Sequence, residues 1–167
     1  MLTALLLFAC TDDRNVDSSA GPIEACTASA DTLVEIGRVG GTLFTPFSDG
    51  ESVRLESAPQ GGQGVSVALR TGGVSTEGAV DVLLEPYWNG AVQGSFVSEG
   101  LPLYCTEEDN GDQYGRVTGT VVGFDPDLYV TDDDLAVLDG ETIDLLVGLT
   151  SSDGAYAEGH VDVVIEF

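Results

Sequence analysis

The sequence predicts an all-β domain, and three observations lead to this prediction. Helical periodicity is nearly absent, apolar and polar residues alternate with period two in several short segments, and glycine-containing turn pairs separate these segments. Such pairs supply the positive φ angles that tight reversals of a strand need. Strands at this spacing favour a single Greek-key, immunoglobulin-like β-sandwich of about seven to nine strands.

The alternation is clearest in three segments, Val65–Arg70, Val80–Leu84 and Val161–Phe167. In the last strand Val161, Val163, Ile165 and the final Phe167 are expected to face the core of an edge strand, whereas His160 and its acidic neighbours face solvent. Turns are expected at seven pairs, which are Asp49-Gly50, Gly61-Gly62, Gly72-Gly73, Asn89-Gly90, Asn110-Gly111, Asp139-Gly140 and Asp153-Gly154.

Two segments between these strands have a distinct composition. Residues 132–135 open with three aspartates and predict a single helical turn with an aspartate as its N-cap. Residues 58–64 are rich in glycine and precede a strong strand, so the chain there must bend or let another backbone approach closely.

The first ten residues have the pattern of a bacterial lipoprotein signal. An apolar run over residues 1–9 ends in Leu7-Phe8-Ala9, and Cys10 follows as the residue that would receive the lipid. No basic residue precedes the run, which indicates that the recorded start lies downstream of the true one. The run is too short to span a membrane. We therefore expect a lipid-anchored protein of the cell envelope, with the outer membrane favoured because Thr11, and not an aspartate, follows the cysteine.

Residues 10–30 are predicted to form the lipidated cysteine and a disordered acidic tether, because they hold too little apolar surface to offset the entropy of ordering. Residues 31–167 suit one β-sandwich domain with one core.

Charge excludes one class of partner. The chain has five arginines, no lysine and 29 acidic residues, for a formal net charge of −24. Nucleic-acid binding depends on cationic neutralisation of phosphates, so a nucleic-acid partner is not expected. The expected partners are the membrane, through the lipid on Cys10, and a protein of the envelope.

The cysteine count agrees with the lipoprotein interpretation. If Cys10 carries lipid, Cys26 and Cys105 remain as the one pair that could form a disulfide, in a compartment that permits it. Two free buried thiols are the alternative.

An acidic turn is the best-motivated metal site. Oxygen-donor side chains and a turn glycine are packed into six residues, and hard cations such as calcium prefer oxygen ligands. The candidate calcium ligands are Glu107, Glu108, Asp109, Asn110 and Asp112. Their spacing does not fit an EF-hand, and a solvated acidic loop is the alternative; no other cofactor is expected.

Catalysis is not predicted. The chain has one histidine, His160, and lacks the Gly-x-Ser-x-Gly turn of serine hydrolases. Paired carboxylates for a hydrolase are abundant in so acidic a chain and therefore carry little information.

Several turn motifs resemble those of a group of uncharacterised predicted lipoproteins that are common in myxobacteria. The matching segments are Glu35-Ile36-Gly37, Phe44–Gly50, Ala58–Gly64, Asp139-Gly140 and Asp153-Gly154. Gly64 stands where those proteins tend to have histidine. The resemblance implies an envelope lipoprotein with an immunoglobulin-like sandwich and implies no activity.

Together these observations predict a lipid-anchored envelope lipoprotein with a non-catalytic interaction, adhesion or scaffold role. A calcium- or small-ligand-binding module is the alternative, and a hydrolase with paired carboxylates is the remote one.

Overall fold

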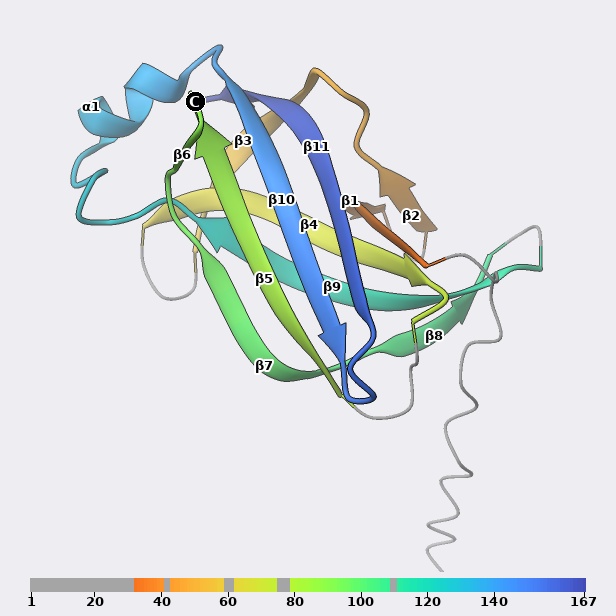
Figure 1. Cartoon of the computed structure of the whole chain (residues 1–167). Helices are drawn as coiled ribbons and strands as arrows, with labels where there is room; N and C mark the ends of the chain where they lie inside the picture. The colour runs from red at the N-terminus through yellow and green to blue at the C-terminus, as the bar shows by residue number, and fades with distance from the viewer. Residues whose placement is uncertain (1–31, 41–42, 59–61, 75–78, 109–110) are drawn as a thin grey trace, which may run out of the picture.

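Eleven strands and one short helical segment make up the described part of the computed structural model, which covers residues 32–40, 43–58, 62–74, 79–108 and 111–167 (Figure 1). The predicted signal and tether, which include Cys10 and Cys26, lie outside the described residues. The strands are β1 (Leu33–Gly40), β2 (Leu43–Pro46), β3 (Glu51–Ser57), β4 (Gln63–Gly72), β5 (Ala79–Trp88), β6 (Ala91–Val92), β7 (Phe96–Pro102), β8 (Tyr104–Glu107), β9 (Gln113–Gly123), β10 (Thr142–Ser151) and β11 (Tyr156–Glu166). The strand number exceeds the predicted seven to nine because β2, β6 and β8 have only two to four residues each.

The strands form the two layers of a β-sandwich, as the alternation predicts. One layer contains β1, β2, β4, β8 and β9, and the other contains β5, β6, β7, β10 and β11. In Figure 1 the long strands of the second layer run steeply across the view, and β4 and β9 cross behind them. Neighbouring strands are antiparallel except β3 and β11, which are parallel although more than 100 residues separate them in sequence (Glu51 pairs with Val163).

Strand β3 belongs to both layers. Its first half pairs with β11, with Val53 opposite Ile165, and its second half pairs with β4, with Leu55 opposite Val65. At the opposite side of the sandwich the chain changes layers again between β7, which pairs with β5, and β8, which pairs with β9. A single buried residue, Leu103, separates these two strands. The two layers are therefore joined by strands at both sides.

The core consists of the aliphatic side chains that alternate along the strands. Val80, Val82 and Leu84 of β5 point inward, and residues 81, 83 and 85 between them point outward. Strand β11 alternates as predicted over residues 160–166, but two expectations for its end are wrong. Phe167 is 55% exposed, and β11 is not an edge strand because it lies between β10 and β3.

The glycine turns agree with the prediction at all seven positions. The second residue of each predicted pair has a positive φ angle. The turn between β5 and β6 is the tightest case, with two residues, Asn89 and Gly90, at φ angles of 50° and 78°. Positive φ at both central residues is the geometry of a type I′ hairpin turn.

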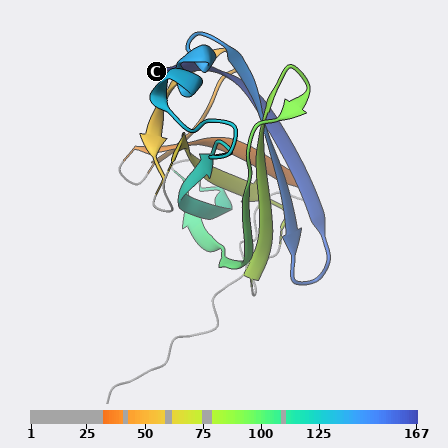
Figure 2. The same ribbon diagram turned by 90° about the vertical axis from the view of Figure 1, so that its left-hand side faces the viewer.

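The short helix α1 (Asp132–Leu135) forms where the aspartates predicted a helical turn, and a 3-10 turn, Ala136–Leu138, continues it. Its N-cap is Thr131 rather than the predicted aspartate: the threonine hydroxyl accepts the backbone N–H of Asp134, whose carboxylate accepts the Thr131 backbone N–H. Figure 2 shows α1 beside the C-terminus at one end of the sandwich. No helix in the described ranges has the length and apolar character needed to cross a membrane.

Candidate functional site

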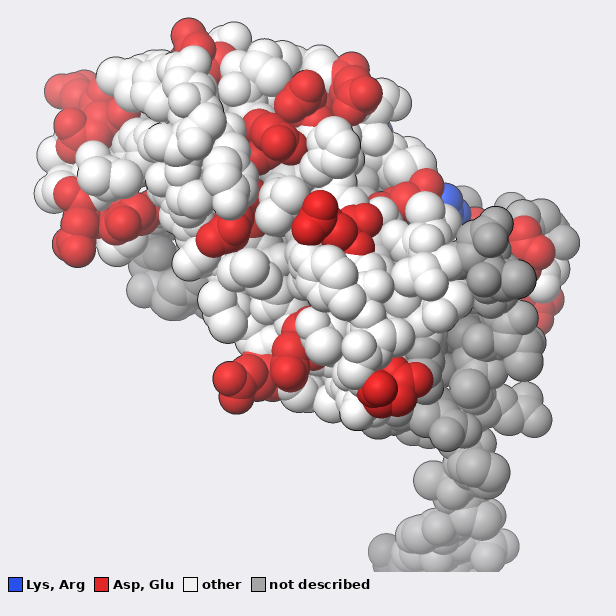
Figure 3. Space-filling model, viewed as in Figure 1, with Lys and Arg blue, Asp and Glu red and all other residues white. Residues whose placement is uncertain are grey.

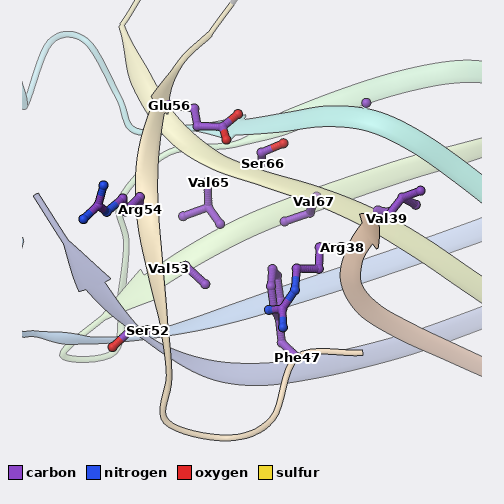
Figure 4. A pocket seen from close by; sticks show the side chains of 12 residues that line it. Arg38, Val39, Phe47, Ser52, Val53, Arg54, Glu56, Val65, Ser66 and Val67 are labelled. Carbon is purple, nitrogen blue, oxygen red and sulfur yellow. The ribbon is translucent and has the colours of Figure 1, made fainter. Parts of the chain in front are cut away.

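The candidate site is an opening between β1 and β3 at one side of β4 (Figure 4). The pairing of β1 with β4 ends at Ala68, and the pairing of β3 with β4 ends at Val65. Ser66 and Val67 lie between these two pairings, where β3 leaves β4 for β11. The opening is thus a direct consequence of β3 belonging to both layers.

The opening has a volume of about 480 Å³, which lies within the range of about 300–1,000 Å³ that small-ligand sites occupy. Aliphatic side chains and one phenyl ring make up much of its wall, and charged groups stand at its rim (Figure 4). The lining residues that matter to its chemistry are Arg38, Phe47, Arg54, Glu56, Val65 and Val67.

The rim of this opening carries arginine, which is scarce in the chain. Arg38 forms an ion pair with Glu51, and its guanidinium lies 5.7 Å from the centroid of the Phe47 ring. Arg54 contacts Glu166 at 3.6 Å, and its side chain is 85% exposed. An ion pair this exposed is weak. The Arg54 guanidinium is therefore readily available to another anion.

The other two described arginines are buried in a separate cluster. Arg70 donates to Glu35 (Nε to Oε2, 2.6 Å) and to both carboxylate oxygens of Glu108 (2.9 and 2.8 Å). Arg116 donates to Glu108 Oε1 at 2.9 Å. Burial acts to lower the pKa of Arg70, but the hydrogen bonds to Glu108 and Glu35 outweigh it and raise this pKa above its ordinary value.

Aromatic rings complete this buried cluster. The Arg70 guanidinium lies 4.9 Å from the ring centroid of Phe44 and 4.7 Å from that of Tyr114. Cation–π contacts of this kind hold a guanidinium in a fixed place. The cluster joins β1, β2, β4 and β9 to the end of β8, so its evident role is to hold these strands together.

Only some of the predicted calcium ligands lie in the described part of the chain. Asp109 and Asn110 lie outside the described residues, and Glu107 and Asp112 flank them. Both carboxylate oxygens of Glu108 accept hydrogen bonds from arginine. Across the described ranges no three His, Cys, Asp or Glu side chains are grouped so that they could hold a metal ion. The calcium site therefore stays a prediction.

Trp88, His160 and Cys105 do not line the opening. Trp88 is partly buried against the core, and its indole N–H donates to Glu141 at 3.1 Å. His160 is 73% exposed, and its Nδ1 lies 3.6 Å from Asp144 Oδ1. Cys105 lies on β8, and its predicted disulfide partner Cys26 is outside the described residues, so this pairing stays a prediction.

Gly64 shows why its segment is rich in glycine. A Cβ atom on Gly64 would lie 2.2 Å from the carbonyl oxygen of Val122, because β4 and β9 approach closely where Gly64 pairs with Gly123. A histidine, which the resembling proteins tend to have here, would not fit this backbone. The close approach that the sequence predicted is confirmed.

Comparisons with known proteins add a distant structural likeness. No protein-family model matches the chain, and no curated protein matches it. A crystal structure of CopC from Methylosinus trichosporium OB3b is similar at 15% identity and a TM-score of 0.31, over 71% of this chain and 85% of that one. A likeness this distant carries no argument about the ligand or activity of this chain.

Proposed function

We propose that the chain is a non-catalytic binding protein of the bacterial envelope, anchored by lipid on Cys10, and that the opening between β1 and β3 binds a small acidic ligand. The anchor rests on the lipoprotein signal pattern alone. The ligand class rests on the opening and on the charges around it.

The observation that carries the proposal is the position of the two exposed arginines. In a chain with a formal net charge of −24, Arg38 and Arg54 both stand at the same opening. A carboxylate or phosphate would be repelled over most of an acidic surface, and a guanidinium is a good hydrogen-bond donor to either group. The aliphatic wall beside them favours a ligand with a short apolar part next to its acidic group.

The lining offers serine hydroxyl groups without a base to activate them, which supports a binding role over a catalytic one. The twelve described lining residues include Ser52 and Ser66 but no histidine that could activate them. His160 instead stands exposed on β11 beside Asp144.

Titration with three molecules of equal chain length tests the ligand class. Hexanoate, hexanol and hexylammonium would be added to the isotope-labelled full chain, and amide shifts would be followed by NMR. We expect hexanoate to bind at residues of β1, β3 and β4. We expect Arg54→Gln to weaken this binding roughly five- to tenfold, which corresponds to about 1–1.4 kcal/mol, the net value of one hydrogen bond.

Glu56→Gln is the matched control, because it removes a carboxylate from the same lining. We expect it to tighten hexanoate binding. Equal binding of hexanoate and hexylammonium, or no effect of Arg54→Gln, would contradict the proposal.

The anchor is tested separately. Cys10→Ser is expected to move the protein from the membrane fraction to the soluble fraction. Unchanged membrane partitioning of that variant would contradict the lipid anchor and leave the ligand experiment unaffected.

A further inference from the structure

The outer face of the second layer carries a groove that is separate from the opening between β1 and β3. The groove has a volume of about 250 Å³ and crosses β5, β7, β10 and the start of β11. It shares no lining residue with the opening. Three apolar or aromatic side chains of this groove are exposed, namely Val97 (66%), Leu83 (37%) and Tyr156 (58%).

Strand register brings these side chains together. Leu83 pairs with Val97 on one side and with Gly148 on the other, and all three residues face outward. Gly148 has no side chain to fill its place, and the Tyr156 ring covers it: a Cβ atom there would lie 3.0 Å from the Tyr156 hydroxyl oxygen. The ring therefore lies over the sheet next to Leu83, and the three exposed groups form one patch.

The Tyr156 ring is fixed in this position by its hydroxyl group, which donates to Glu158 Oε2 at 2.8 Å. A tyrosine ring that is held in place and exposed offers a large contact area at a low entropic cost. Tyrosine and exposed aliphatic groups surrounded by polar groups mark protein-binding surfaces.

The surroundings of this patch are acidic. Asp81 and Glu99 line the groove, and Glu85, Asp144, Glu158 and Asp162 stand on the same face of β5, β10 and β11. Figure 3 shows red acidic side chains spread over this face, with uncharged surface between them. The negative charge of the rim favours a positively charged partner, because like charges brought together across an interface are unfavourable.

We infer that this face docks a basic segment of another protein, in which lysine or arginine residues flank an aliphatic one. The aliphatic side chain would contact Val97, Leu83 and Tyr156, and the basic side chains would meet the carboxylates at the rim. A second copy of this chain does not fit, because it would place one acidic face against another.

Peptide titration followed by NMR tests the inference on the full chain. The probe is an end-blocked pentapeptide of alternating lysine and leucine, and the control peptide has glutamate in place of lysine. We expect the basic peptide to shift amides of β5, β7 and β10, and we expect the acidic peptide to shift none. Binding should weaken severalfold from about 20 mM to about 150 mM salt, because screening shortens the reach of the rim charges.

Val97→Ser and Val137→Ser make a matched pair of variants. Both valines are more than half exposed, but Val137 lies in the turn after α1 and outside the groove. We expect Val97→Ser to weaken the basic peptide about five- to tenfold, since an aliphatic contact is lost, and Val137→Ser to leave it unchanged. Equal effects of the two variants, shifts spread over the whole surface, or self-association that strengthens with salt would each overturn the inference.

Discussion

The carboxylate of Glu108 is expected to be among the most important single groups for the stability of the domain. It accepts hydrogen bonds from two arginines, and the side chains of Glu108, Arg70 and Arg116 are only 19%, 15% and 5% exposed. Glu108→Gln removes the negative charge and keeps the size of the side chain. Its effect therefore isolates the charge.

The size of the loss in stability follows from the two buried arginines that Glu108→Gln leaves without this carboxylate. Removing one partner of a buried ion pair costs about 3–5 kcal/mol, and Arg70 keeps Glu35 as a second partner. We therefore expect Glu108→Gln to lower the free energy of unfolding by about 2–4 kcal/mol. For a domain of this size that corresponds to a fall in Tm of roughly 6–15 °C.

The assay is thermal unfolding followed by circular dichroism, with Glu107→Gln as the control. Glu107 is the adjacent residue and is exposed, so its variant should change the free energy of unfolding by less than about 0.5 kcal/mol. If Glu108→Gln and Glu107→Gln melt within about 1 °C of each other, the buried cluster does not hold the strands as we describe.

Two further predictions concern the packing of the layers and the cap of α1. Gly159→Ala is expected to destabilise the domain by about 1–3 kcal/mol, because the new Cβ would lie 2.3 Å from the backbone oxygen of Val34. Gly148→Ala should destabilise it less, since the new Cβ would meet the end of the Tyr156 side chain, which can move. Comparable denaturation midpoints for the two variants would refute this. Hydrogen bonds from the Thr131 hydroxyl and backbone hold the pKa of Asp134 below its ordinary value. The stabilisation that the ionised Asp134 carboxylate gives the cap is thus present above the unfolded-state pKa of about 4. It is lost as pH falls through the lower pKa that Asp134 has in the folded state. Thr131→Ala should return the Asp134 pKa toward that value in an NMR titration, and an unchanged pKa would contradict the cap.

Features with a local cause could be predicted from the sequence. The turn at Asn89-Gly90 depends on two adjacent residues, and the inward side chains of β5 depend on simple alternation. The cap of α1 was assigned one residue too late, because Thr131 and the aspartates after it are all good N-cap residues.

Features that depend on distant partners could not be predicted. The hydrogen bonds of Glu108 are one example, because its partner Arg70 is 38 residues away in sequence. The candidate site could not be predicted for the same reason: Arg38 and Arg54 line one opening only because β3 leaves β4 for β11. The scarcity of arginine was the available signal, since in a chain with only five basic residues each of them is a candidate for a specific role.

The double membership of β3 has a consequence for how the domain unfolds. Glu51–Arg54 and Leu55–Ser57 are consecutive parts of one strand, yet each part is hydrogen-bonded into a different layer. Neither layer can open along this side without disturbing the strand that the other layer needs, and Leu103 links the layers in the same way on the other side. We therefore expect the two layers to unfold together as one cooperative unit rather than in succession.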